Sequence, residues 1–341
     1  MKSNKRLVNS LFHSLVFLVC LVCLACLVTS LALLTPPLAV AADNPEMQEI
    51  NENVPGVFGL GWLDQTQSFA SDSANALANQ LDRFFGVQRS DIEAAYSALR
   101  VTATESWNDI DDFDSGLRLR GKVHLPRINE RISLIFSEED GDGTSYFSVN
   151  SASVAQQETT RVNLELNLAD EKAHRLFFRV GLRSGLKGRV SMRYRYEPVT
   201  QGNTINRFTQ SLYFKDGDGL GSFSRYQLDH VLNEESLIRW TNDVRFEESF
   251  TGSEYTSSLE FLQFRSSQTA MSWYARINGE TSPGFVTSYD LGVRIRKNIS
   301  REWLFLELEP GFTWRKQAYN IAREGTPYIV LRLEMAIGTF N

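Results

Sequence analysis

Arginine and lysine recur at every second or fourth position in several stretches of this chain. Arg118, Arg120 and Lys122 form one such stretch, and Arg189 and Arg193 belong to another. Residues two apart in an extended strand point to the same side, so each stretch would place its cations on one face. A wall of fixed cations attracts anions through its electric field. The spacing therefore predicts that the protein attracts anions with rows of fixed charge, and not that it acts on them with one reactive group.

The charged residues that share this side of their strands are basic early in the chain and mixed or acidic later. The candidates for lining an interior are Arg118, Arg120, Lys122, Arg175, Arg179, Arg183, Arg189, Arg193, Arg195, Asp243, Asp290, Glu307, Glu309 and Glu334. Unpaired charge in a narrow interior is costly. Two interpretations stay open: the arginines pair with carboxylates and fill the interior, or a basic wall faces an acidic wall across water and favours anionic or polar solutes.

Catalytic chemistry has little support in the sequence. After the first 42 residues the histidines are His124, His174 and His230, and only His230 follows an acidic neighbour, Asp229. Neighbours on a strand point to opposite faces. The segment Gly181–Gly185 lacks the Gly-x-Ser-x-Gly spacing of a nucleophile elbow. We therefore expect no catalytic residues and no cofactor, with a surface-lipid hydrolase as the weaker alternative.

Two Asp-Gly-Asp-Gly segments contain Asp140 and Asp142, and Asp216 and Asp218. Carboxylates at alternate positions can hold calcium, whereas Asp-Gly is also a favoured tight-turn pair. The distal glutamate of a calcium loop is missing after Asp140. We expect turns, and these four aspartates are weak metal candidates.

Long alternating strands must position the charged rows. In residues 326–338, apolar Ile329, Leu331, Leu333 and Met335 alternate with polar residues that include Glu334. Alternating runs of about ten residues can cross a bilayer at a tilt. The same period of two continues from Leu99 to the end of the chain. The pattern predicts an all-β, antiparallel transmembrane β-barrel of 12–14 strands over residues 99–341.

The first 42 residues have the pattern of an export signal. Lys2, Lys5 and Arg6 precede an apolar run, and Ala39-Val40-Ala41 fits a cleavage site. An uncleaved anchor is the alternative, because the run is long. All three cysteines of the chain lie in this segment, so the mature chain would lack thiols, which suits an oxidising periplasm.

Residues 43–98 differ from the alternating strands and predict a periplasmic extension, or a plug, with two short helices. The chain is irregular to Gln67. A helix is then expected from about Phe69 to Phe85, since apolar residues recur there at spacings of three and four. A second helix would begin at the capping box Ser90–Glu93. A tether that docks a periplasmic protein and a plug that folds into the barrel both stay open.

Net charge excludes one class of partner. The chain has 41 acidic and 35 basic residues, a formal net charge of −6. Three of the basic residues, Lys2, Lys5 and Arg6, belong to the export signal, so the remainder is more acidic still. An acidic chain without a basic run is a poor candidate for nucleic-acid binding.

The export signal, cysteine-free body, alternating strands and apolar final strand resemble bacterial outer-membrane β-barrel proteins in general, porin-like, over roughly residues 99–340. The resemblance implies residence in the outer membrane after export, contact with its lipid, and a monomer. Barrels of about 8 strands fill with side chains, whereas 16–18 strands leave a pore. A count near fourteen therefore predicts a diffusion channel for small polar or anionic solutes. A non-conducting structural or assembly barrel that binds a periplasmic partner through residues 43–98 is the alternative.

Overall fold

The computed structural model describes most of the chain after residue 60. The described ranges are 61–85, 98–110, 112–124, 132–137, 161–171, 173–183, 187–198 and 202–338. The predicted export signal, the second predicted helix, and Asp140 and Asp142 lie outside these ranges.

Fourteen strands follow one helix, α2 (Gly61–Phe84), in the described residues. The strands are β1 (Ala98–Asn108), β2 (Asp112–His124), β3 (Ile132–Ser137), β4 (Arg161–Asp170), β5 (His174–Arg183), β6 (Lys187–Tyr196), β7 (Thr204–Lys215), β8 (Gly219–Asn233), β9 (Ser236–Glu247), β10 (Ser253–Ser266), β11 (Thr269–Glu280), β12 (Phe285–Asn298), β13 (Leu304–Arg315) and β14 (Glu324–Gly338).

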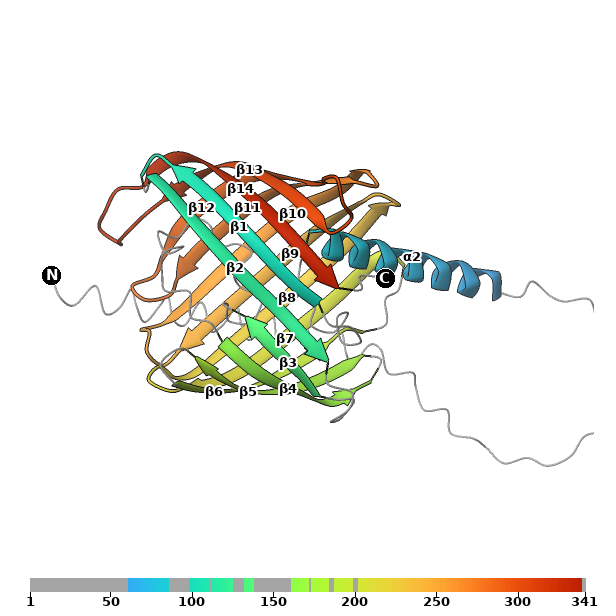
Figure 1. Cartoon of the computed structure of the whole chain (residues 1–341), viewed down its shortest axis with the longest axis horizontal. Helices are drawn as coiled ribbons and strands as arrows, with labels where there is room; N and C mark the ends of the chain where they lie inside the picture. The colour runs from blue at the N-terminus through green and yellow to red at the C-terminus, as the bar shows by residue number, and fades with distance from the viewer. Residues whose placement is uncertain are drawn as a thin grey trace, which may run out of the picture. The chain divides into compact units, whose positions relative to one another are not determined.

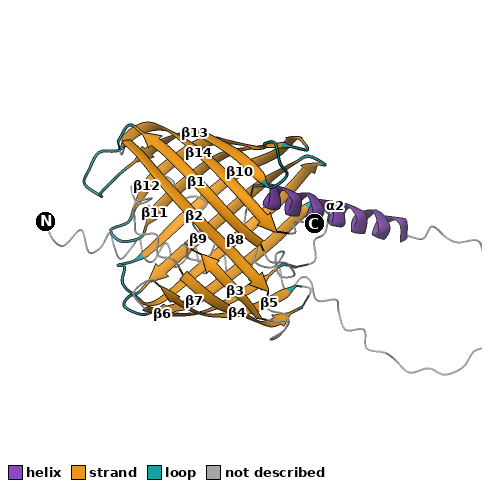
Figure 2. Ribbon diagram, in the orientation of Figure 1, coloured by secondary structure: helices purple, strands orange, loops and turns teal. Residues whose placement is uncertain are grey.

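The strands form one closed antiparallel barrel (Figures 1 and 2). Each strand pairs with its sequence neighbours, and β1 pairs with β14 from Ala98 opposite Gly338 to Asn108 opposite Tyr328. Closure leaves no unpaired sheet edge. The predicted fold class is confirmed, and the count of fourteen lies within the predicted range of 12–14 strands. β2 begins at Asp112, which lies directly opposite Asn108, the last residue of β1.

Side chains alternate between the two faces of the barrel wall as the sequence predicts. On β14, Leu331 and Leu333 are 43% and 44% exposed on the outside, whereas Val330 and Glu334 are buried on the inside. The outer face of the other strands is similarly apolar. A continuous apolar exterior of this extent is unfavourable in water and suits contact with hydrocarbon.

The described Asp-Gly-Asp-Gly segment, Asp216 to Gly219, forms the turn between β7 and β8. The Asp218 amide donates to the Lys215 carbonyl over 3.1 Å, and Gly217 has a φ of +91°, which disfavours other residues. Within the described ranges no three His, Cys, Asp or Glu side chains are arranged to hold a metal. Asp216 and Asp218 therefore lie in a tight turn, as expected, and whether they bind a metal stays a prediction.

Helix α2 begins at Gly61, not near Phe69 as predicted, because residues 62–72 contain no proline and can extend the helical turns. Its buried residues, among the side chains described from Ser73 onward, are Ala74, Leu77, Ala78, Leu81 and Asp82. Their spacing forms one stripe along the helix. Within the described part of the chain, no helix has the length and apolar character needed to span a bilayer.

Candidate functional site: the charged interior of the barrel

The inner face of the barrel has two regions that differ in charge pattern. The first, which we call the paired wall, consists of Tyr274, Arg294, Arg296, Glu307, Glu309, Tyr328, Arg332 and Glu334 on β11–β14. The second, which we call the arginine wall, consists of Arg118, Arg120, Lys122, Arg175, Arg179, Arg189, Arg193 and Arg195 on β2, β5 and β6. Both sets lie on the inward parity of their strands, opposite the exposed apolar residues.

Cross-strand register assembles the paired wall. Glu307 on β13 lies opposite Arg296 on β12 and opposite Arg332 on β14. Because all three strands place these residues on the inward face, this carboxylate meets an arginine on either side. Opposite charges therefore alternate around this part of the barrel.

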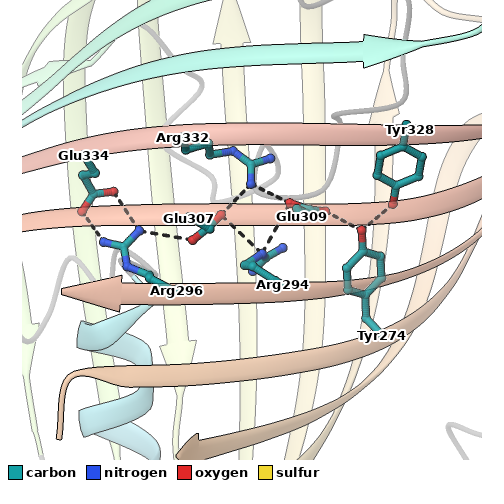
Figure 3. A network of polar contacts seen from close by, with 8 residues as sticks. All are labelled: Tyr274, Arg294, Arg296, Glu307, Glu309, Tyr328, Arg332 and Glu334. Carbon is teal, nitrogen blue, oxygen red and sulfur yellow. Dashed lines mark hydrogen bonds and ion pairs between the residues drawn. The ribbon is translucent and has the colours of Figure 1, made fainter. Parts of the chain in front are cut away.

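The resulting ion pairs form a continuous chain (Figure 3). Arg296 reaches Glu334 at 2.6 Å and Glu307 at 3.2 Å. Arg332 bridges Glu307 and Glu309, at 2.5 Å from each. Glu307 and Glu309 are 1% and 2% exposed. Buried carboxylates require such partners, since the loss of hydration is otherwise uncompensated.

Arg294 and Arg100 extend this chain at its two sides. The Arg294 Nε lies 3.6 Å from Glu307 and 3.5 Å from Glu309. Arg100 on β1 lies 3.1 Å from Glu334, across the strand pair that closes the barrel. The charges of the paired wall are therefore largely satisfied within the protein.

Two tyrosines complete the paired wall at its end. The Tyr274 hydroxyl donates to Glu309 and lies 2.5 Å from the Tyr328 hydroxyl. The rings lie against inward-facing glycines: a Cβ at Gly292 would come within 2.5 Å of the Tyr274 hydroxyl, and Gly311 is covered by the Tyr328 ring. The absence of a side chain at both positions lets the tyrosines lie flat on the wall.

Asp290 on β12 has mainly neutral partners. It accepts hydrogen bonds from Thr313 Oγ1 at 2.6 Å and from Asn278 Nδ2 at 2.8 Å, and Arg276 lies 4.0 Å away. Asp243 instead receives two hydrogen bonds of 2.7 Å from Arg225. Both predicted carboxylates therefore face inward and are engaged by the wall.

The cations of the arginine wall have partners of several kinds within the described strands. Glu165 on β4 binds both Lys122, at 3.1 Å, and Arg179. Arg193 donates to the Ser211 hydroxyl over 3.2 Å, and the Arg189 guanidinium lies 4.8 Å from the centre of the Tyr213 ring. Arg175 on β5 lies 3.2 Å from Asp170 on β4. Carboxylates, hydroxyls and aromatic rings are thus all among the partners of the cations here.

Most of the residues predicted to line the interior face inward in the structure. Lys122, Arg179, Arg189 and Arg193 are buried, whereas Arg118, Arg120, Arg175 and Arg195 are half-buried. Asp243, Asp290, Glu307, Glu309 and Glu334 are buried inward-facing residues of β9 and β12–β14. The side chains of Arg183 and His124 lie outside the described residues. Whether these residues select a solute stays a prediction.

One buried cluster is missing from the set predicted from sequence. Asp229 on β8 is 0% exposed and lies 2.5 Å from Arg207 on β7 and 2.8 Å from Arg239 on β9. Arg239 also reaches Asp82 of α2 at 2.6 Å. The alternation of side chains along β7 and β8 could have predicted that Arg207 and Asp229 face inward. No sequence pattern indicated that Asp82, on a helix, would join them.

The histidines contact hydroxyl groups in the described part of the chain. His174 Nδ1 lies 2.7 Å from the Tyr194 hydroxyl, and His230 Nδ1 lies 2.9 Å from Thr204 Oγ1. Catalytic histidines are commonly oriented by a carboxylate and placed beside a nucleophile. Neither described histidine shows a carboxylate contact of this kind.

No family model matches the chain, and no curated protein matches it. The solved structures that it resembles include the KdgM porin in complex with disordered oligogalacturonate, at 6% identity and a TM-score of 0.35, over 71% of this chain and 99% of that one. An anion-selective porin from Comamonas acidovorans matches at 8% identity and 0.42, over 71% and 98%. OccK5 from Pseudomonas aeruginosa matches at 8% and 0.41, over 72% and 98%.

These likenesses concern the fold alone. The closed antiparallel barrel, apolar outside and charged inside, is the architecture of bacterial outer-membrane β-barrel proteins. The resemblance expected from the sequence is therefore confirmed at the level of the barrel.

Proposed function

We propose that this protein is an outer-membrane diffusion channel for small polar or anionic solutes. The observation that carries the proposal is the unequal charge of the inner face. The paired wall holds its carboxylates and arginines in mutual contact. In the described strands β2–β6, by contrast, the eight cations of the arginine wall have among their carboxylate partners Glu165, which binds both Lys122 and Arg179, and Asp170, which lies 3.2 Å from Arg175. An excess of fixed cations attracts anions into the interior.

The register of β5 and β6 adds to this argument. Arg175 lies directly opposite Arg195, and both face inward and are half-buried. Like charges placed opposite each other repel. Asp170 on β4, 3.2 Å from Arg175, offsets part of this repulsion, and an anion that passes between the two arginines would offset more of it.

The test is conductance of the full mature chain in a planar bilayer under a potassium chloride gradient. We expect a reversal potential that indicates preference for chloride. Preference should weaken at high salt, since the Debye length falls from about 10 Å at 0.1 M to about 3 Å at 1 M.

Charge reversal identifies the residues responsible. The variant Arg189→Glu, Arg193→Glu and Arg195→Glu should shift the preference toward cations, whereas the matched triple Arg→Lys variant should retain the wild-type preference. Arg195→Gln alone, at a half-buried position, gives a smaller shift with less risk to folding. An unchanged reversal potential in the Glu variant would remove the arginine wall from the mechanism.

A further inference from the structure

We propose that α2 is a plug that closes one end of the barrel, and that its displacement opens the conducting path. This inference rests on the proposed channel function. It concerns the end of the barrel where the turns Asn233–Ser236 and Ser266–Thr269 lie, and where α2 is drawn in Figure 1.

The first observation is an apolar contact between helix and inner face. The stripe of Ala74, Leu77, Ala78 and Leu81, with Phe85 just after the helix, is at most 5% exposed. It packs in one cluster with wall residues of β7–β11, namely Ile205, Val231, Leu237, Leu262 and Ala270. These wall residues have the inward parity of their strands, so the part of the helix from Ala74 onward lies against the inside of the barrel.

The wall itself is altered where the helix docks. Inward positions further along the same strands are charged, such as Arg207 on β7, Asp229 on β8 and Arg239 on β9. At the ends of these strands the inward residues become Ile205, Val231 and Leu237. An apolar patch that faces water inside a channel mouth is unfavourable, and the apolar stripe of α2 covers it.

The second observation is a buried ion pair across the contact. Asp82 is 1% exposed, and its Oδ1 lies 2.6 Å from Nη1 of Arg239. Arg239 also binds Asp229 through Nε at 2.8 Å, and Asp229 binds Arg207. The wall thus keeps Arg239 paired with Asp229 when the helix leaves, so undocking exposes Asp82 to water without stranding an unpaired charge in the barrel.

The third observation connects the plug to the paired wall. The Phe84 ring lies edge-on to Phe264 and to Phe305, with centroids 5.3 Å and 5.6 Å apart. The Arg296 guanidinium lies 4.5 Å from the Phe305 centroid, and Arg296 binds Glu307 and Glu334. Docking therefore places Phe84 against Phe305, whose ring lies beside Arg296, a member of the ion-pair chain drawn in Figure 3.

The test displaces the helix by charge and leaves the strands unchanged. Asp82→Arg sets an arginine against Arg239, and like charges in a buried contact repel. Gln80→Arg introduces the same side chain on the exposed face of α2 and is the matched control. Leu81→Cys is added to the wild type and to each of the two variants. It reports docking because the chain has no cysteine after Cys26, and because Leu81 is 0% exposed while the helix is docked.

We expect maleimide to label Leu81→Cys slowly in the wild-type and Gln80→Arg backgrounds and rapidly in the Asp82→Arg background. Single-channel current should rise several-fold in Asp82→Arg and remain at the wild-type level in Gln80→Arg. Adding Phe84→Cys and Phe264→Cys to Asp82→Arg, and joining these thiols with a short cleavable bis-maleimide, should lower the current again. A reductant that cleaves the linker should restore it.

The outcomes separate the two proposals. Rapid labelling in Asp82→Arg with a current equal to that of the wild type would overturn the plug and leave the channel intact. Rapid labelling with no current in any variant would overturn the channel, and the plug with it. Rapid labelling in the wild type would show that α2 is not docked in the protein, which also overturns the plug.

Discussion

The paired wall and the arginine wall both present arginines on the inner face of the same barrel. On β12–β14 the register sets Glu307 between Arg296 and Arg332. On β5 and β6 it sets Arg175 opposite Arg195. In the first arrangement a carboxylate lies between two arginines. In the second, two arginines lie opposite each other, and Asp170 lies 3.2 Å from one of them, Arg175. The difference shows that cross-strand register decides which charges become neighbours on the inner face.

The largest effect should come from breaking the paired wall. Glu307→Gln removes a carboxylate that contacts Arg294, Arg296 and Arg332. These three arginines remain inside the barrel in the variant. Loss of one partner from a buried ion-pair network costs about 3–5 kcal/mol. We expect the free energy of unfolding in urea, measured by tryptophan fluorescence in detergent, to fall by this amount.

The control for this prediction is Glu302→Gln, at an exposed position in the turn before β13. It should leave the free energy of unfolding unchanged. Equal losses in the two variants would mean that the ion pairs of the paired wall contribute no more than exposed charges do.

An intermediate effect should come from crowding the tyrosines of the paired wall. A Cβ at Gly311 would meet the Tyr328 ring and come within 2.8 Å of the Leu291 carbonyl oxygen, whereas a Cβ at Gly188 on β6 has nothing within 4 Å. Overpacking of this kind costs about 1–3 kcal/mol. Gly311→Ala should therefore lower the free energy of unfolding, and Gly188→Ala should not. If both variants unfold alike, the tyrosine packing is looser than the structure indicates.

The smallest effect on stability should come from the arginine wall. Arg193→Gln replaces the charged donor to Ser211, whose hydrogen bond contributes about 1.5–3 kcal/mol, by a neutral amide that can still donate, and it also reduces repulsion among neighbouring cations. We expect a small change in the free energy of unfolding together with a measurable loss of anion preference in bilayers. A destabilisation as large as that of Glu307→Gln would show that the two walls do not differ in the proposed way.

Particular residues show how far the sequence leads. The alternation of Leu331 and Leu333 with Arg332 and Glu334 predicted which side of β14 faces outward, and the exposure of these residues agrees. The same alternation predicted the number of strands and the inward parity of the charged rows. The spacing of Ala74, Leu77, Ala78 and Leu81 predicted a helix with one apolar stripe.

The partners of these residues could not be predicted in the same way. Asp229 binds Arg239 because the register of β8 and β9 sets the two opposite each other. Asp82 reaches Arg239 from a helix that precedes the first strand. A turn displaced by one residue would change each cross-strand pair while leaving the composition of every strand the same.

By itself the sequence determined the alternation of apolar and charged side chains, the count of strands and the stripe on α2, because these are local properties of strands and helices. Only the tertiary structure decided which charges are neutralised, which cations remain together and where α2 packs. Those outcomes depend on barrel closure and on cross-strand register, which bring together residues far apart in the chain.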